Sequence, residues 1–235
     1  MTEPLSGEAL RALAAFDTPT ICNALELVTP ERRAFGFNRR PLVAPFPALK
    51  PIVGYARTIM VRSREPHPRD KAAARQKRLG WYEYVAAAPQ PSIVLMQDVD
   101  GPDAGFGAFW GEVQSNVHKA LGCIGVVTDG AIRDIDVWAD GFMALAGSIM
   151  PSHAHVDIVD FGNTVSVAGM MVSSDDIVHA DRHGAVVVPR AAVAALPAAV
   201  ATLVKREKVL LDACKRPGFG VEDLRQAFAR ADDIH

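Results

Sequence analysis

The sequence predicts an α/β fold, because its first half alternates helical and strand patterns while its later part is rich in short β segments. Of its 235 residues, 49% are apolar and 22% are charged, a composition typical of soluble globular proteins. A chain of this length suits one large domain or two small ones, and it is long enough to bury a substantial core.

The N-terminal part predicts two short helices, over residues 6–15 and 18–27, with Asp17 and Thr18 as capping residues between them. Alternating β-branched and polar residues then predict a strand over 51–63.

A charged loop broken by prolines is expected at 64–70, followed by an Ala-, Lys- and Arg-rich helix over 70–88. The continuous apolar run in 91–100 is typical of a strand buried on both faces. The glycine-rich stretch 101–111 lacks the G-x-G-x-x-G spacing of a dinucleotide site, so we expect no nucleotide cofactor.

The middle of the chain predicts a helix, a strand and a second short helix, over 112–121, 123–129 and 133–140. Short β segments follow, at 143–147, 154–162, 164–172, 176–181 and 185–189. The C-terminal part predicts a long amphipathic helix over 190–215 and a last helix over 220–230, so helices are expected at both ends of the chain.

Charge and cysteine content exclude several classes of protein. The net charge is −2 and basic residues are dispersed, so we expect no nucleic-acid partner and no membrane surface. Cys22, Cys123 and Cys214 are far apart, which favours reduced thiols in a cytoplasmic protein. The N-terminus does not have the pattern of a signal peptide, and no apolar run approaches the roughly 18 residues of a membrane span.

Two oppositely charged residues, Arg133 and Asp134, follow the strand 123–129 and its Asp-Gly turn. The simpler interpretation is a solvated helix start with a local ion pair worth less than about 1 kcal/mol. The alternative is a functional site, because catalytic groups in α/β sheets gather where strands end. A carboxylate suits Mg²⁺, and the planar guanidinium suits a carboxylate or a developing enolate oxygen.

A second candidate lies at the helix start formed by Gly111 and Glu112. Free amides and the helix dipole at such a start bind carboxylates and phosphates. The alternative is a capped surface helix whose first turn carries an acidic residue, as the dipole prefers.

Four histidines form two pairs, His153 with His155 and His179 with His183. In a strand the first pair would point the same way, as two metal ligands could, but no third ligand is evident. The simpler interpretation of the second pair is a β-turn through Asp181. We expect His153 or His155 to shape substrate choice rather than to hold a metal.

The segments "GEVQSNVHKALGCIGVVTDGAIRDIDVWADGF" and "DIVHADRHGAVVVPR" resemble the family of 4-hydroxy-4-methyl-2-oxoglutarate aldolases and regulator-of-ribonuclease-E-activity-A-like (RraA-like) proteins. The likeness extends through "FDTPTICNAL" and "PIVGYARTIMV" and so covers most of the chain. The aldolase signature is an acidic residue, twenty intervening residues and Arg-Asp; here residues 113–132 separate Glu112 from Arg133 and Asp134.

The resemblance implies a single domain over 1–235 with the layered β/β/α "swivelling" fold. It also implies a homotrimer or a dimer of trimers, with sites between subunits, and catalysis with Mg²⁺ or Mn²⁺.

Residue by residue, the resemblance makes Asp134 the metal ligand and places Arg133 against the keto oxygen and carboxylate of the substrate. Glu112 would orient water, and the amides of Val113, Gln114 and Ser115 would hold the pyruvyl carboxylate.

The sequence departs from the aldolase pattern at two places. Characterised aldolases carry Asp where this chain has Glu112, and the segment "IMPSHAHVDIVDFG" differs from the usual text. Glu207 is the nearest match to the acid that a neighbouring subunit contributes in that branch; the alternative is a surface residue among Lys205, Arg206 and Lys208.

The leading hypothesis is therefore a metal-dependent lyase that cleaves the C3–C4 bond of a small 2-oxo acid through a pyruvate enolate. Both retro-aldol cleavage and oxaloacetate decarboxylation would follow from such a site. The alternative is a non-catalytic binding protein of the ribonuclease-regulator branch. A methyltransferase is rejected, because no glycine-rich nucleotide loop follows an early strand.

Overall fold

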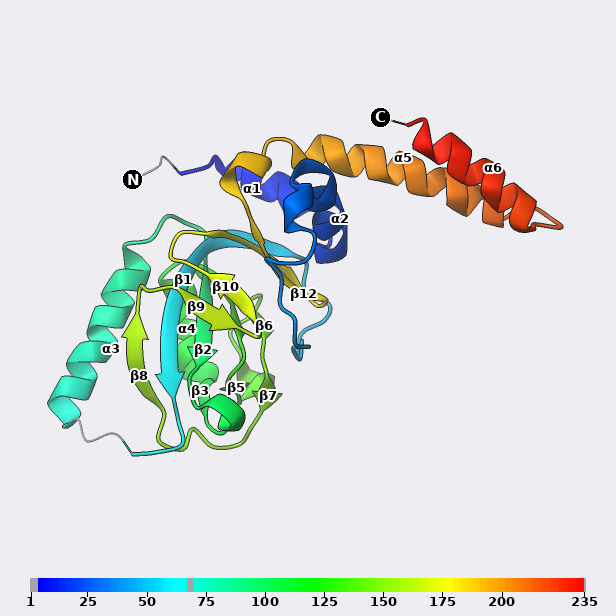
Figure 1. Cartoon of the computed structure of the whole chain (residues 1–235). Coiled ribbons are helices and arrows are strands. Elements are labelled where there is room, and N and C mark those ends of the chain that lie inside the picture. The colour runs from blue at the N-terminus through cyan, green and yellow to red at the C-terminus, as the bar shows by residue number, and fades with distance from the viewer. Residues whose placement is uncertain (1–3, 67–69, 235) are drawn as a thin grey trace.

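The computed structural model describes residues 4–66 and 70–234 and has a mixed α/β fold, as predicted. Figure 1 shows a curled sheet with helices against it and a helical hairpin, α5 and α6, that projects away from the body. The middle of the predicted loop 64–70, residues 67–69, lies outside the described residues.

The main sheet has seven strands, built around the long strand β1 (Ile52–Arg62). Its path order is β12 (Gly184–Val188), β11 (Ile177–Asp181), β1, β2 (Ser92–Asp98), β4 (Cys123–Thr128) and β6 (Met143–Leu145). Strand β8 (Asp157–Phe161) pairs with the second half of β1, beyond the residues that pair with β11. The pairs β1–β2, β2–β4 and β4–β6 are parallel, whereas β8, β11 and β12 run antiparallel to their neighbours.

Two smaller β structures flank this sheet. A parallel three-stranded sheet contains β3 (Ala108–Trp110), β5 (Ala131–Ile132) and β7 (Ser148–Ile149). A hairpin pairs β9 (Val165–Val167) with β10 (Met170–Val172) through a turn at Ala168 and Gly169, both with positive φ.

The α-helices are α1 (Gly7–Leu13), α2 (Thr18–Val28), α3 (Lys71–Ala86), α4 (Glu112–Ala120), α5 (Leu196–Cys214) and α6 (Val221–Asp232). Short 3₁₀ turns lie at Pro30–Arg32, Gly101–Asp103, Ile135–Val137 and Arg190–Ala192. The predicted cap at Asp17 is confirmed, since its carboxylate accepts a hydrogen bond from the Thr20 amide at 2.9 Å.

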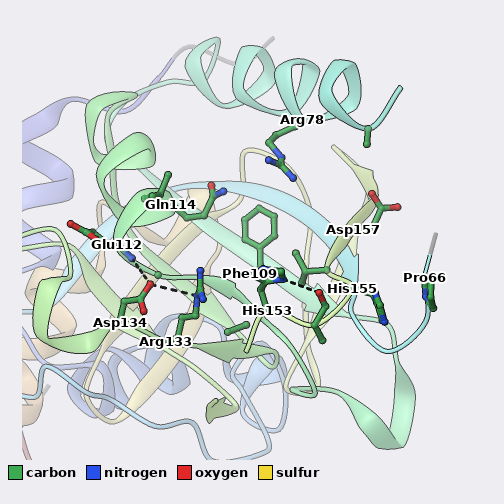
Figure 2. A pocket seen from close by; sticks show the side chains of 16 residues that line it. Pro66, Arg78, Phe109, Glu112, Gln114, Arg133, Asp134, His153, His155 and Asp157 are labelled. Atoms are coloured by element: carbon green, nitrogen blue, oxygen red, sulfur yellow. Dashed lines mark hydrogen bonds and ion pairs between the residues drawn. The ribbon is translucent and has the colours of Figure 1, made fainter. Parts of the chain in front are cut away.

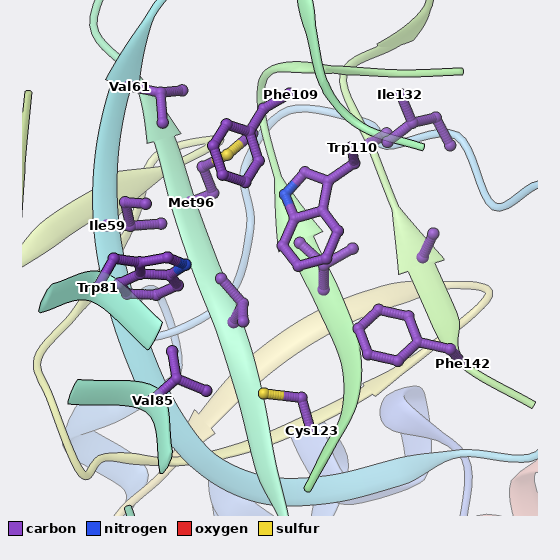
Figure 3. Close-up of a cluster of buried hydrophobic side chains, with 14 of the residues drawn as sticks. Ile59, Val61, Trp81, Val85, Met96, Phe109, Trp110, Cys123, Ile132 and Phe142 are labelled. Atoms are coloured by element: carbon purple, nitrogen blue, oxygen red, sulfur yellow. The ribbon is translucent and has the colours of Figure 1, made fainter. Parts of the chain in front are cut away.

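One face of the main sheet is covered by α3 and the segment of β3. Trp81 and Val85 of α3 pack with Ile59, Met96 and Trp110 in one buried apolar cluster (Figure 3). The opposite face is covered by the β9–β10 hairpin, whose apolar side chains join those of β2, β4 and β11. The result is a layered arrangement of β hairpin, sheet and helix.

A third cluster closes the end of the sheet away from α3. Leu13 of α1, Ile21 of α2 and Leu196 of α5 pack against Tyr55 and Val188 there. Within the described residues, no helix is long and apolar enough to cross a membrane.

Four local predictions are wrong. The expected β segment 164–172 is the hairpin of β9 and β10, because Ala168 and Gly169 form a turn, and the expected helix 190–215 begins only at Leu196, after the 3₁₀ turn Arg190–Ala192. The expected helix 133–140 is only the 3₁₀ turn Ile135–Val137, because Asp134 takes a left-handed conformation that no α-helix continues. The expected strand 154–162 begins only at Asp157, because Ala154 has a φ of 46° and forms a turn.

Candidate functional site

A cavity of about 660 Å³ opens between α3, the start of α4 and the turn before β8. It gathers eight of the residues singled out from the sequence: Gly111, Glu112, Val113, Gln114, Arg133, Asp134, His153 and His155. Figure 2 shows Gln114, Arg133, His153 and other lining residues around this space. Residues separated by about forty positions therefore meet at one site.

Arg133 and Asp134 are placed by the small parallel sheet. The Arg133 amide donates to the carbonyl of Trp110 on β3, at 2.9 Å, directly after β5 ends. Asp134 then adopts φ 56° and ψ 39°, a left-handed conformation that aspartate tolerates better than most residues. Their side chains are about one-third exposed, and Arg133 Nε lies 3.5 Å from Asp134 Oδ2. The pair is thus a positioned group at the cavity wall, not the start of a solvated helix.

The start of α4 lies against the Asp134 carboxylate. Asp134 Oδ2 accepts a weak hydrogen bond from the Glu112 amide at 3.4 Å. A Cβ on Gly111 would lie 2.5 Å from the same oxygen, so only glycine leaves room for this carboxylate. The negative charge therefore sits at the positive end of the helix dipole.

The first-turn amides of α4 are only partly available to a ligand. Val113 and Gln114 line the cavity, and amides in a first helical turn have no intrahelical acceptor. Ser115 does not line it: its amide donates to the Gly111 carbonyl at 3.0 Å. Its buried hydroxyl donates to the Glu112 carbonyl and accepts from the Ala139 amide, at 2.9 and 3.1 Å. Ser115 is therefore a structural residue beneath the helix start.

His118, on the buried face of α4, anchors this helix in the core. Its Nδ1 lies 2.7 Å from the Gln114 carbonyl and its Nε2 accepts a hydrogen bond from Trp81 Nε1 at 2.9 Å. These two partners require the neutral tautomer protonated on Nδ1. Burial lowers the pKa of His118 to about 4. No sequence motif marks His118, although its position six residues into an amphipathic helix could have indicated burial.

The His153–His155 segment is an anchored turn rather than part of a strand. The Ala108 amide donates to the Ser152 carbonyl at 2.9 Å, and the His155 amide donates to the Ser63 carbonyl at 3.0 Å. His153 Nδ1 lies 2.8 Å from the carbonyl of Ala154, which leaves Nε2 as the acceptor nitrogen. Both imidazoles are exposed and line the cavity without strand spacing.

The second histidine pair lies elsewhere. The predicted β-turn is confirmed, since β11 and β12 form a hairpin that pairs Asp181 with Gly184. His179 is fully buried, with Nδ1 3.0 Å from Thr18 Oγ1 and Nε2 3.0 Å from the Phe16 carbonyl. Burial lowers its pKa, so a neutral imidazole holds α2 against the hairpin. His183 Nδ1 lies 3.1 Å from Asp181 Oδ1.

Glu207 is not part of the cavity of its own chain. It is exposed on α5, in the hairpin that projects from the body (Figure 1). The sequence analysis also missed Arg78 and Asp157, which line the cavity from α3 and β8. No local motif marks either residue; only the packing of α3 and β8 against β1 brings them to the site.

The donor set suits a hard divalent cation. Asp134 and Glu112 both line the cavity, and Mg²⁺ in proteins is usually held by one or two carboxylates and water. Over the described part of the chain, no group of three or more His, Cys, Asp or Glu residues could form a protein-only metal cage. An ion here would therefore depend on Asp134 and on water, as the sequence analysis expects.

Fold and site together define an α/β protein with an open, charged cleft at the start of a helix. The sequence profile of the RraA-like family, described as Aldolase/RraA, matches residues 18–187. The chain therefore belongs to the RraA-like family. The matched region contains the cavity residues and ends before α5 and α6.

Solved structures support the fold assignment. A protein from Pseudomonas syringae pv. tomato superposes with a TM-score of 0.71 at 20% identity, covering 96% of both chains. Streptomyces coelicolor RraAS2, described as an unusual member of the RNase ES inhibitor RraA protein family, gives 0.67 at 23% identity, covering 92% of this chain and 100% of that one. A structure described among novel cellulases from gut-associated microbes gives 0.72 at 16% identity, covering 88% and 89%. At these identities the likeness shows the fold alone. The comparison with curated proteins gives no match.

Proposed function

We propose that this protein is a divalent-metal-dependent lyase that cleaves the C3–C4 bond of a small 2-oxo acid to release pyruvate. The observation that carries the proposal is the meeting of Glu112, Arg133 and Asp134 with the first-turn amides of α4 in one cavity. The family contributes to the argument, because its description includes aldolases as well as RraA proteins.

Asp134 is the residue that would hold Mg²⁺ or Mn²⁺, with Glu112 nearby to position water. When bound, the cation supplies Lewis-acid stabilisation of the negative charge that develops on the 2-keto oxygen. Asp134 is suited to this role because its backbone conformation and the space above Gly111 fix the direction of its carboxylate.

Arg133 would donate to the keto oxygen and to the C1 carboxylate of the substrate. Its planar guanidinium grips two oxygens at once, and the amides of Val113 and Gln114 offer further donors to the same carboxylate. These donors stabilise an enolate more strongly than a neutral ketone, so they lower the barrier.

Glu112 would move the proton. In a retro-aldol reaction, a water next to Glu112 takes the proton of the 4-hydroxyl group as the C3–C4 bond breaks. The bonding pair becomes the enolate of pyruvate, and C3 then takes up a proton to give pyruvate. Decarboxylation of oxaloacetate leaves the same enolate and releases CO₂.

His153 and His155 would contact the part of the substrate that leaves. Both line the cavity on the turn before β8, and among residues 4–66 and 70–234 no group of three or more His, Cys, Asp or Glu residues could hold a metal. An anomalous-scattering peak from bound Mn²⁺ within bonding distance of either imidazole would contradict this assignment.

Assembly into a homotrimer or a dimer of trimers is also proposed. Glu207 can reach a cavity only if it comes from another copy, because α5 projects away from the cavity of its own chain. In such an assembly it would be the acid that the neighbouring subunit contributes. We further propose that residues 1–235 form one domain.

The test is metal-dependent release of pyruvate from oxaloacetate and from a 4-hydroxy-2-oxo acid, with an EDTA control. We expect turnover with Mg²⁺ or Mn²⁺ and about a hundred-fold loss in Arg133→Lys, which keeps the charge but loses the two-pronged grip. Failure of the wild-type protein to turn over either substrate class with any divalent metal would refute the proposal.

That failure would favour a second candidate, a non-catalytic regulator of RNA processing. The likeness in fold to Streptomyces coelicolor RraAS2 supports this candidate. A regulator of this kind would bind a ribonuclease and would not require Asp134.

A further inference from the structure

The turn that carries His153 is attached to the same strand as Arg133. At the start of β3 the Ala108 amide donates to the Ser152 carbonyl at 2.9 Å. Two residues further along β3, the Trp110 carbonyl accepts a hydrogen bond from the Arg133 amide, also at 2.9 Å. Two residues of an extended strand span about 7 Å. A single strand therefore sets the spacing between the backbones of Arg133 and His153.

Close packing holds this turn in an unusual conformation. Ala154 has a φ of 46°, and of the four non-glycine residues with positive φ in the described part of the chain, Asp134 and Ala154 line the cavity. Such conformations cost free energy and are often found at functional sites. The Val156 amide donates to the His153 carbonyl at 3.1 Å, and a Cβ on Gly107 would lie 2.7 Å from the same oxygen. Glycine at position 107 therefore lets the turn lie directly against the chain that leads into β3.

The imidazole of His153 has one engaged nitrogen and one available nitrogen. Nδ1 donates to the Ala154 carbonyl at 2.8 Å, so Nε2 carries the lone pair in the neutral ring. Within residues 4–66 and 70–234, no protein group bonds to Nε2, and His153 lines the cavity. Nδ1 remains a donor when Nε2 gains a proton, so the Ala154 carbonyl orients both forms of the ring. Nε2 can therefore accept and release a proton while the ring keeps its position.

The proposed reaction leaves one proton without an assigned donor. The water next to Glu112 takes the proton of the 4-hydroxyl group, but C3 of the pyruvate enolate must also gain a proton. The electron pair of the broken C3–C4 bond stays on C3, on the side from which the other fragment departs. A donor that contacts the departing fragment therefore faces the carbon that is protonated. In the view of Figure 2, His153 lies between Arg133 and His155 along the cavity.

We propose that His153 is the catalytic acid that protonates C3 of the pyruvate enolate. This inference rests on the proposed lyase function. The protonated imidazole gives its Nε2 proton to C3, the π electrons of the enolate form the new C–H bond, and the C2 oxygen returns to a carbonyl. The neutral ring then regains a proton from solvent. His153 lies in "IMPSHAHVDIVDFG", where the chain departs from the aldolase pattern, so the resemblance does not assign this role.

The same step in reverse can be measured without breaking a C–C bond. The neutral imidazole would remove a proton from the methyl group of pyruvate, so the protein should exchange these protons for deuterium in D₂O. Proton NMR with Mg²⁺ present follows this exchange. We expect His153→Asn to lower the exchange rate about a hundred-fold, as for the loss of a general acid–base group. Asparagine can still donate to the Ala154 carbonyl, but it cannot transfer a proton at the position of Nε2.

The matched control is His183→Asn. His183 lies in the turn between β11 and β12 and does not line the cavity. This variant should exchange the methyl protons of pyruvate at the wild-type rate.

Three further measurements distinguish a proton donor from a binding residue. Calorimetric titration should show that His153→Asn binds pyruvate as tightly as the wild-type protein. Free imidazole should restore exchange in His153→Ala, because it can occupy the vacated space and carry the proton. Release of CO₂ from oxaloacetate should fall less than exchange does in His153→Asn, because the C3–C4 bond breaks before C3 is protonated.

The outcomes separate this inference from the lyase proposal. Wild-type exchange in His153→Asn, or a loss of exchange matched by an equal loss of pyruvate binding, would overturn the role of His153 and leave the lyase function standing. A wild-type protein that neither exchanges these protons nor releases pyruvate from a 2-oxo acid would overturn both.

Discussion

At the scale of single residues, Asp134 has an unusual backbone conformation. Its left-handed backbone turns the chain sharply after β5 and directs the carboxylate to the α4 start. Outside glycine, such conformations cost free energy and persist where the surrounding structure enforces them, often at functional sites. Nothing in the local sequence pattern predicts this conformation.

Substitution of Asp134 separates chemistry from folding. Asp134→Asn keeps the size and tolerates the left-handed conformation, whereas Asp134→Ala adds a steric cost of about 1 kcal/mol. We expect both variants to lose roughly a hundred- to thousand-fold in lyase rate, because the carboxylate is lost. Only the alanine variant should melt at a lower temperature. More than about a tenth of wild-type activity in Asp134→Asn would mean that the cation is held elsewhere.

His118 makes stability depend on pH. Its pKa is about 4 in the folded protein, against about 6.5 in an unfolded chain, because burial disfavours the charged form. The unfolded state therefore binds this proton first as the pH falls. The free energy of unfolding should drop by about 3 kcal/mol between pH 6.5 and pH 4 through this residue.

Urea unfolding at several pH values measures this effect. His118→Gln should start from a lower stability at pH 7.5 but lose less than the wild-type protein over the acidic range. His179 acts in the same direction, because burial lowers its pKa as well, and it contributes to the remaining slope. Equal slopes for His118→Gln and the wild-type protein would contradict the assignment.

At the scale of elements, the junction of β3 and α4 fixes the site. Gly111 has an extended backbone, so alanine would not strain the chain itself; the added Cβ would instead meet the Asp134 carboxylate at 2.5 Å. We expect Gly111→Ala to lower kcat at least tenfold by displacing this carboxylate, since small displacements of catalytic groups are costly.

The matched control for this substitution is Gly220→Ala. Gly220 also has an extended backbone and precedes α6, and no atom lies within 4 Å of its added Cβ. The activity of the Gly220→Ala variant should equal that of the wild-type protein. Wild-type kcat in Gly111→Ala would contradict the role given to the β3–α4 junction.

The main elements could be predicted because their signals are local. Buried strands such as β1, β2 and β4 leave long apolar runs, and α3 and α4 have clear boundaries, so these agree with the predicted ranges within a few residues. Errors arose where one residue with positive φ interrupts a regular pattern, at Asp134 and at Ala154. Neither residue is a glycine, so the residue most typical of positive φ does not mark either interruption.

At the scale of the whole molecule, the cavity shows the limit of prediction from sequence. The Glu112, Arg133 and Asp134 set could be predicted because its members lie within one helix–strand–turn unit. The cavity wall formed by Arg78 and Asp157 could not be predicted, because α3 and β8 reach the cavity only through their packing on β1. Non-local pairing of this kind leaves no periodic trace in the sequence.

The assembly prediction also belongs to this scale. The projecting α5–α6 hairpin exposes large apolar side chains, among them Val204, Leu211 and Phe228 at 50–59% exposure. Such side chains on an isolated hairpin favour burial against another copy. Light scattering should give about three or six times the chain mass of 25.2 kDa. A monodisperse monomer at micromolar concentration would contradict the prediction.

The aromatic cluster beneath α4 gives the molecule an intrinsic optical reporter. The chain has three tryptophans, and all lie in or against one apolar cluster. Trp81 donates a hydrogen bond to His118, the centroid of the Trp110 ring lies 4.5 Å from that of the His118 ring at a tilt of 48°, and the Trp138 ring centroid lies 6.4 Å from that of Trp110. Tryptophan emission therefore samples this half of the protein and no other. The backbone carbonyl of Trp110 also accepts a hydrogen bond from the Arg133 amide. Ligand entry and protonation of His118 should therefore both change the tryptophan fluorescence, without any label.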